Sequence, residues 1–167
     1  MRRIVTLFFI LFISISLYAS WNVGYDCRSI DALWKDSMRF DIEGGYRYKD
    51  IRVSATCSFG ICDINQLWFF DGGLSVSVYP FSDLGLNVGT TVFRIGKLMG
   101  IGAPDDDIVF LSEAFLAWTI SFGYVYIEPR LTFSDTLSSE NTCLTILREE
   151  ISQYSRFRLS LLVGVGI

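Results

Sequence analysis

The chain has 167 residues, enough for one domain, of which 51% are hydrophobic and 16% aromatic. Its formal net charge is −4, and an acidic chain is a poor candidate for binding nucleic acid. The absence of histidine excludes a Ser-His catalytic pair and histidine metal sites. A lone Ser or Asp could still catalyse, but no motif marks one, and we expect neither an enzyme nor a cofactor.

Residues 1–20 have the features of a secretory signal peptide, followed by one domain over residues 21–167. Arg2 and Arg3 form a basic start, an apolar run follows, and the segment ends in small residues. No later apolar run approaches the ~20 residues of a transmembrane helix. An exported chain this hydrophobic is therefore a soluble barrel or sandwich with a large core, or a barrel that sits in lipid.

Eight stretches alternate between apolar and polar or small side chains. Successive side chains of a strand point to opposite faces, so each stretch predicts a β-strand with one apolar face. The predicted strands are residues 21–27, 38–48, 51–59, 68–79, 84–92, 110–122, 125–133 and 157–167.

The connections between these strands alternate between long and short. Lys49 and Asp50 form a two-residue hairpin turn, while residues 134–155 form a long polar segment. Pro129 falls on the apolar face of its strand, where it must cost a ladder hydrogen bond or mark a bulge.

The closing strand is the stretch on which the interpretation of the whole chain depends. Only Leu162 interrupts its alternation, and its length fits the roughly 9–11 tilted residues with which a β-strand crosses a bilayer. Its outward set is Phe157, Leu159, Leu161, Val163, Val165 and Ile167.

This strand resembles the closing strand of bacterial outer-membrane β-barrels, whose apolar residues recur at every second position back from the carboxyl end. Those proteins usually end in Phe or Trp, whereas this chain ends in Ile167. The whole pattern is most similar to the small eight-stranded families typified by OmpW, OmpX and the OmpA barrel. The resemblance implies contact with outer-membrane lipid and with the barrel assembly machinery.

The volume of the apolar set indicates which face is outside. It holds about forty large residues, and an eight-stranded barrel encloses only a column of packed side chains or one small ligand. We therefore predict an all-β, eight-stranded antiparallel up-and-down transmembrane β-barrel with the apolar set facing lipid. A soluble lipocalin-like or sandwich fold is the alternative.

Loop length predicts the orientation. In this class short turns are periplasmic and long loops lie outside, so an even strand number places both termini in the periplasm of a diderm bacterium. Aromatic residues near the short turns predict an interfacial girdle. They are Tyr46, Tyr48, Tyr79, Phe81, Phe122 and Tyr124.

The inward set is charged. Because an isolated buried charge is costly, the simplest interpretation is a paired network that fills and occludes the lumen; the alternative is a gated polar conduit or a solute site. The predicted network is Arg39, Asp41, Glu43, Arg47, Arg52, Asp71, Glu128, Arg130, Arg156 and Arg158, with Asp26 on the same side.

Four cysteines in an exported protein suggest oxidation. Cys62 and Cys143 both fall in predicted outer loops and form the preferred disulfide, whereas Cys57 is expected to face lipid as a small apolar residue. The run 105–107 is three aspartates, but its spacing matches no calcium loop, and no metal site is predicted.

Two functions fit these features. The first is a porin-like or small-solute uptake role, in which the resemblance to OmpW implies a small hydrophobic solute. The second is a non-conducting surface protein whose extracellular loops mediate adhesion or envelope contacts.

Overall fold

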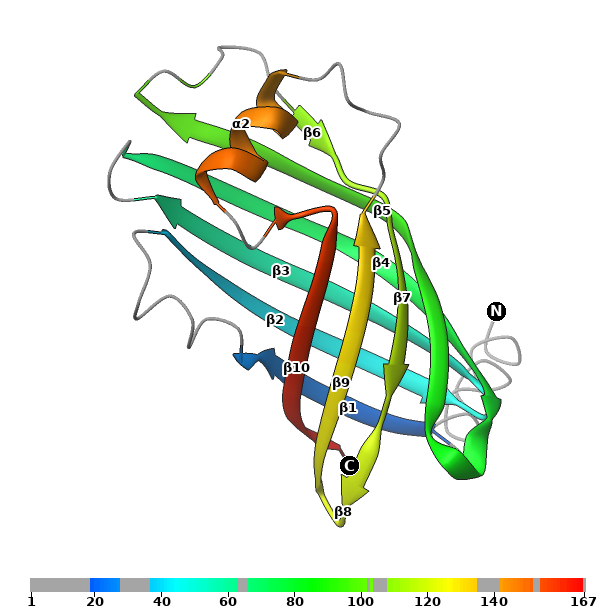
Figure 1. Ribbon diagram of the computed structural model, residues 1–167. Helices are drawn as coiled ribbons and strands as arrows, with labels where there is room; N and C mark the ends of the chain where they lie inside the picture. The colour runs from blue at the N-terminus through cyan, green and yellow to red at the C-terminus, as the bar shows by residue number, and fades with distance from the viewer. Residues whose placement is uncertain are drawn as a thin grey trace, which may run out of the picture.

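A computed structural model of the chain describes residues 19–27, 37–62, 66–101, 103, 108–134, 142–151 and 154–166. Strands wrap around a common axis, and one short helix covers the end opposite the C-terminus (Figure 1). The elements are β1 (Ala19–Asp26), β2 (Ser37–Tyr48), β3 (Ile51–Cys62), β4 (Leu67–Phe81), the 3-10 turn η2 (Ser82–Leu84), β5 (Leu86–Gly100), β6 (Ile108–Phe110), β7 (Glu113–Trp118), β8 (Ile120–Phe122), β9 (Val125–Ser134), α2 (Thr142–Glu150) and β10 (Phe157–Gly166).

The strands form a closed antiparallel barrel. β1 to β5 each pair with the next strand in sequence, and β10 pairs with both β9 and β1, which closes the ring. β6 and β7 both pair with β5, and β7 and β8 both pair with β9, so these three are segments of one barrel strand. The described residues thus form eight barrel strands, which confirms the predicted fold class. Closure pairs the long strands with a neighbour on both sides, as a bilayer requires.

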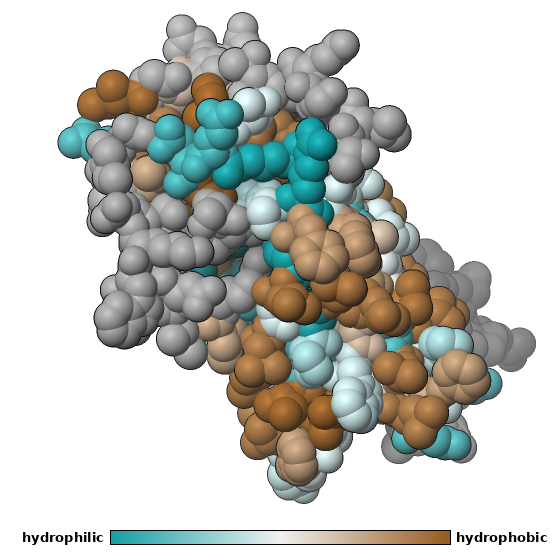
Figure 2. Space-filling view, in the orientation of Figure 1, coloured by the Kyte–Doolittle hydropathy of each residue, from teal (hydrophilic) through white to brown (hydrophobic). Residues whose placement is uncertain are grey.

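The outer surface is apolar and the interior is charged. Trp118 and Leu161 are 50% and 41% exposed, whereas Arg39 and Glu128 are 2% and 0% exposed. Figure 2 shows hydrophobic side chains over much of the barrel wall and hydrophilic ones near α2. A soluble barrel would have the reverse arrangement, and this exterior would aggregate in water. The fold is therefore that of a transmembrane β-barrel.

A bulge makes β5 longer than predicted. Leu74 lies opposite Phe93, but Ser75 lies opposite Thr91, so Val92 is an extra residue in the strand. The bulge offsets the two-residue period, and Arg94 therefore points inward in a region that was expected to begin a loop. The prediction that this strand ends at residue 92 is wrong for that reason.

Pro129 interrupts the ladder without shifting it. β7 pairs Ala117 with Arg130 and β8 pairs Ile120 with Ile127, which is one continuous register. The gap between β7 and β8, at Thr119, falls beside Pro129, which has no N–H to donate. On its other side Thr119 continues the ladder with β5, because its N–H donates to Gly85 O at 2.9 Å. Of the two predicted consequences, the lost hydrogen bond is the one found.

Most of the predicted aromatic girdle surrounds the short turns. Phe81, Phe122 and Tyr124 are exposed there, and the Tyr46 ring packs against Trp21 at 4.9 Å. Tyr79 is the exception, because its position in β4 points into the lumen, where it is 2% exposed. Its assignment to the girdle is therefore wrong.

Two predictions at the chain ends lie largely outside the described residues. Residues 1–18 of the predicted signal peptide and Ile167 are among them. Ala19 and Ser20, the last residues of that predicted leader, pair with Tyr48 and Arg47. Cleavage after Ser20 would remove these two pairs and leave β1 beginning at Trp21.

Barrel closure depends on a glycine at the β10–β1 seam. A Cβ on Gly164 would lie 2.3 Å from Val23 O and 2.6 Å from the Tyr126 ring, whereas one on Gly44 would meet nothing within 4 Å. We expect Gly164→Ala to destabilise the barrel by roughly 1–3 kcal/mol through overpacking. Urea unfolding in detergent, followed by tryptophan fluorescence, measures the loss. Gly44→Ala is the control, and equal midpoints for the two variants would contradict the close approach.

Candidate functional site

The lumen contains a first ionic group, here called the turn-side layer, made of Glu43, Arg52, Glu128 and Arg130. Arg130 donates to Glu43 Oε2 at 2.7 Å and to Glu128 Oε1 at 2.6 Å. Arg52 donates to Glu128 Oε2 at 2.8 Å and also pairs with Glu43. Two guanidinium groups thus neutralise two carboxylates, and each carboxylate is shared by both arginines.

A second group, the loop-side layer, lies nearer the long loops and consists of Arg39, Asp41, Asp71, Arg94, Glu113 and Arg158. Arg94 contacts Asp71 Oδ1 at 2.5 Å and Glu113 Oε2 at 2.8 Å. Arg158 donates to Glu113 Oε2 at 2.7 Å, and Arg39 pairs with Asp41 at 2.8 Å. Three arginines therefore balance three carboxylates.

Hydroxyl groups complete both layers. Ser58 Oγ accepts hydrogen bonds from Arg39 at 3.2 Å and from Arg94 at 2.7 Å. Thr119 Oγ1 donates to Glu128 at 2.6 Å and accepts from Asn87 at 3.1 Å. Such bonds offset the desolvation of the charges and hold each guanidinium in one orientation.

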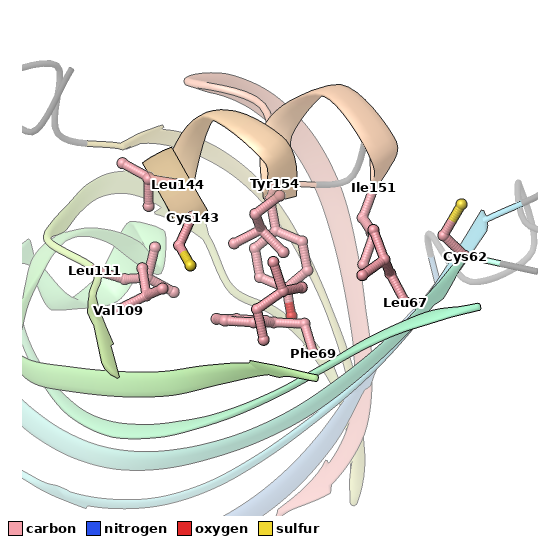
Figure 3. Close-up of a cluster of buried hydrophobic side chains, with 11 residues drawn as sticks. Cys62, Leu67, Phe69, Val109, Leu111, Cys143, Leu144, Ile151 and Tyr154 are labelled. Atoms are coloured by element: carbon pink, nitrogen blue, oxygen red, sulfur yellow. The ribbon is translucent and has the colours of Figure 1, made fainter. Parts of the chain in front are cut away.

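The helix α2 and the residues that follow it form a plug in the loop-side mouth (Figure 3). The plug buries apolar side chains against the inner wall of the barrel, so it is closed to water at its base. The cluster is Cys62, Leu67, Phe69, Leu98, Val109, Leu111, Cys143, Leu144, Leu147, Ile151 and Tyr154. Among the described residues no helix is long and apolar enough to cross a membrane.

Tyr154 joins the plug to the loop-side layer. Its hydroxyl donates to Asp71 Oδ2 at 2.6 Å, and its ring packs edge-on against Phe69 at 4.9 Å. The guanidinium of Arg39 lies over the ring, 4.3 Å from its centroid. Burial, together with the nearby Asp71 carboxylate, raises the pKa of Tyr154 well above its ordinary value.

Sequence reasoning treated this segment as a polar loop. The apolar positions 143, 144, 147 and 151 follow helical spacing in an otherwise polar stretch, and this is the signal that could have revealed α2.

The structure places eight of the ten residues predicted for the lumen in the two layers. Arg47 lies apart from both, with its guanidinium 3.7 Å from the Tyr79 ring and its Nε donating to Lys49 O at 3.0 Å. Arg156 is exposed and precedes β10, so the strand alternation does not apply to it. Its assignment to the lumen is wrong. The residues brought together are Arg39, Asp41, Glu43, Arg52, Asp71, Glu128, Arg130 and Arg158.

Two lumen residues were missed. Arg94 follows the bulge in β5, and the alternation of Phe93 and Ile95 around it would have shown that it points inward. Glu113 points inward in the same way, because its neighbour Ala114 points outward. Both matter, because Glu113 binds Arg94 and Arg158 together.

Cys62 and Cys143 are not joined by a disulfide. All four cysteines are described and remain thiols. Cys62 Sγ lies 3.8 Å from Glu150 Oε2, at the C-terminal end of α2, while Cys143 lies at the other end, about 10 Å along the helix. Bridged cysteines need Cα atoms about 4.4–6.8 Å apart, so the expected pairing does not form in this arrangement.

Space inside the barrel is unevenly distributed. A cavity of about 310 Å³ opens at the short-turn end, here called the turn-side vestibule. Between the two ionic layers the cavity measures only about 20 Å³, room for about one water molecule. In the described part of the chain no cluster of three metal-ligating side chains occurs, and Asp105 to Asp107 lie outside it.

Comparison with known proteins adds little to this geometry. No family model matches the sequence, and no curated protein matches it. One similar solved structure is the crystal structure of Neisserial surface protein A (NspA), with 11% sequence identity and a TM-score of 0.46. The match covers 89% of this chain and 94% of NspA. The fold assignment rests on the strand pairing and the exposed apolar wall described above.

Removing the Glu113 carboxylate should destabilise the barrel. Glu113→Gln removes the carboxylate that Arg94 and Arg158 share, and we expect a loss of about 3–5 kcal/mol. Urea unfolding in detergent measures it, with the exposed Glu149→Gln as control. Adding Arg158→Gln should recover part of the loss by restoring neutrality. A Glu113→Gln midpoint equal to that of the control would show that the pairing contributes little.

Plug docking should weaken in alkali. Because the pKa of Tyr154 is raised on folding, its stabilising contribution is complete below the unfolded value of about 10 and is lost as the pH rises toward the folded value. The difference in absorbance at 295 nm between the wild type and Tyr154→Phe should therefore titrate above pH 10. A difference curve centred near pH 10 would indicate that the hydroxyl is not held by Asp71.

Proposed function

We propose that this protein is an integral outer-membrane barrel with a closed lumen, acting at the envelope surface and not as a general pore. The single observation that carries the proposal is the pair of balanced ionic layers with about 20 Å³ between them. A continuous water path would have to pass both layers and the plug.

The energetic cost of opening supports this choice. Breaking a buried ion pair by moving one partner away costs about 3–5 kcal/mol, and each layer contains several shared pairs. Spontaneous opening through both layers would therefore be rare. A porin-like or solute-uptake role, the other candidate, would require a rearrangement of the plug and of both layers.

We also propose the orientation. Short turns face the periplasm in this class, so both termini would be periplasmic and the plug would lie at the external mouth. The exposed aromatic rings of Phe81, Phe122 and Tyr124 near the turns support an interfacial position for that rim. The long connections would then be the surface available for adhesion or envelope contacts.

The lumen should not conduct. In planar-bilayer recordings we expect no steady conductance from the wild type, and none after deletion of residues 142–150, because both ionic layers remain below the plug. A variant in which all residues of both ionic layers are replaced by Ala in the same deletion background serves as the comparison, since it should leak. Large steady conductance from the wild type would reject the proposal and favour a porin. If the wild type did not conduct but the simple deletion did, the plug would be the sole barrier.

A further inference from the structure

One charged side chain stands on the outer wall of the barrel. Lys97 follows the bulge in β5 with the same orientation as Ile95, so it points outward and is exposed, whereas Arg94 points into the lumen. No other outward-facing residue of the described strands is charged. A lysine on the lipid-facing wall is costly at the middle of the bilayer and nearly neutral at its interfaces, so its depth matters.

The neighbours of Lys97 on this wall are apolar. It lies opposite Phe70 of β4 on one side and Ile108 of β6 on the other. The exposed apolar side chains around it are Trp68, Phe70, Ile95, Met99, Ile108 and Phe110. Among the described residues Lys97 has no ion-pair partner. An ammonium group in such surroundings is stabilised only by reaching the interface or by pairing with an anion there.

Lys97 lies near the loop-side boundary of the apolar wall. It follows Leu86, the first residue of β5, by eleven residues, and one of these is the extra residue of the bulge. At ~3.4 Å per residue and a strand tilt of about 35–45°, the remaining rise is roughly 24–28 Å, against about 25 Å for the apolar band of such barrels. The flexible side chain can therefore extend its ammonium group to the level of the lipid head groups.

The wall beside Lys97 is widened by β6, which pairs only with β5. Ile108 and Phe110 of β6 are 56% and 68% exposed, and Trp68 on the other side is 52% exposed. One cation is thus flanked on both sides by broad apolar surface at the edge of the bilayer. This arrangement complements a lipid that has several acyl chains to lie along the wall and a phosphate to meet the ammonium group.

We infer that Lys97 and the apolar side chains around it bind lipopolysaccharide. The ammonium group pairs with a phosphate of the lipid A part, and the acyl chains pack on the wall on either side. In the orientation proposed above, this boundary lies in the outer leaflet, where lipopolysaccharide is the phosphate-bearing lipid of a diderm bacterium. The inference rests on that orientation and not on the closed lumen, so a conducting wild type would leave it standing.

Native mass spectrometry of the full barrel in detergent, titrated with bis-phosphorylated lipid A, measures the binding. We expect one lipid A to be retained per barrel and Lys97→Gln to weaken its affinity on the order of tenfold, because a charge-assisted bond is lost. Lys97→Arg keeps the charge and should bind within about threefold of the wild type. Lys49→Gln removes an exposed charge at the opposite end and should change the affinity less than about twofold.

Two further lipids identify what is recognised. Dephosphorylated lipid A should bind the wild type and Lys97→Gln equally, and phosphatidylglycerol should bind more weakly than lipid A because it has only two acyl chains. Equal affinities of the wild type and Lys97→Gln for lipid A would overturn the inference, as would undiminished binding of the dephosphorylated form. Phosphatidylglycerol binding as tightly as lipid A would overturn the assignment to lipopolysaccharide. The comparison of lipids needs only the wild type, and heat-modifiable gel mobility shows that each variant is folded.

Discussion

The pairing of charged side chains inside a narrow barrel, whose outer wall is apolar, is the constraint on which the rest of this structure depends. Five arginines and five carboxylates occupy the two layers, and the buried Asp26 lines the small space between them. An unpaired charge here would cost several kcal/mol, so every strand that contributes one must hold it in register with its partner. The pairing of lumen side chains thus fixes the register of the strands. The lipid-facing wall is largely apolar and distinguishes less well between alternative registers.

Regular alternation made most of the barrel predictable. Strands, inward set and lipid-facing set follow from the two-residue period, because a side chain of a paired strand has only two directions. The errors arise where that rule stops. The bulge at Val92 reverses the facing of Arg94, and Arg156 stands before β10 and so outside the alternation. The assignment of Tyr79 to the girdle overlooked the alternation along β4, which points this side chain into the lumen.

The plug could not be found by that rule, because it depends on contacts between distant segments. α2 is short and mostly polar, and its stability comes from the apolar side chains that it buries in the mouth of the barrel. Residues from β3, β4, β5 and β6 supply the other half of the cluster. The expected disulfide was wrong for the same reason. Cys62 and Cys143 were paired only because both were assigned to outer loops, whereas Cys62 contacts the C-terminal end of α2 and Cys143 lies at its N-terminal end.

The two ends of the barrel solve the problem of an open mouth differently. At the long-loop end the chain fills the lumen with its own apolar side chains, and Tyr154 adds one hydrogen bond to the ionic layer beneath. At the short-turn end no described segment folds inward, and a cavity of about 310 Å³ remains. The open space at this end is therefore a consequence of turn length.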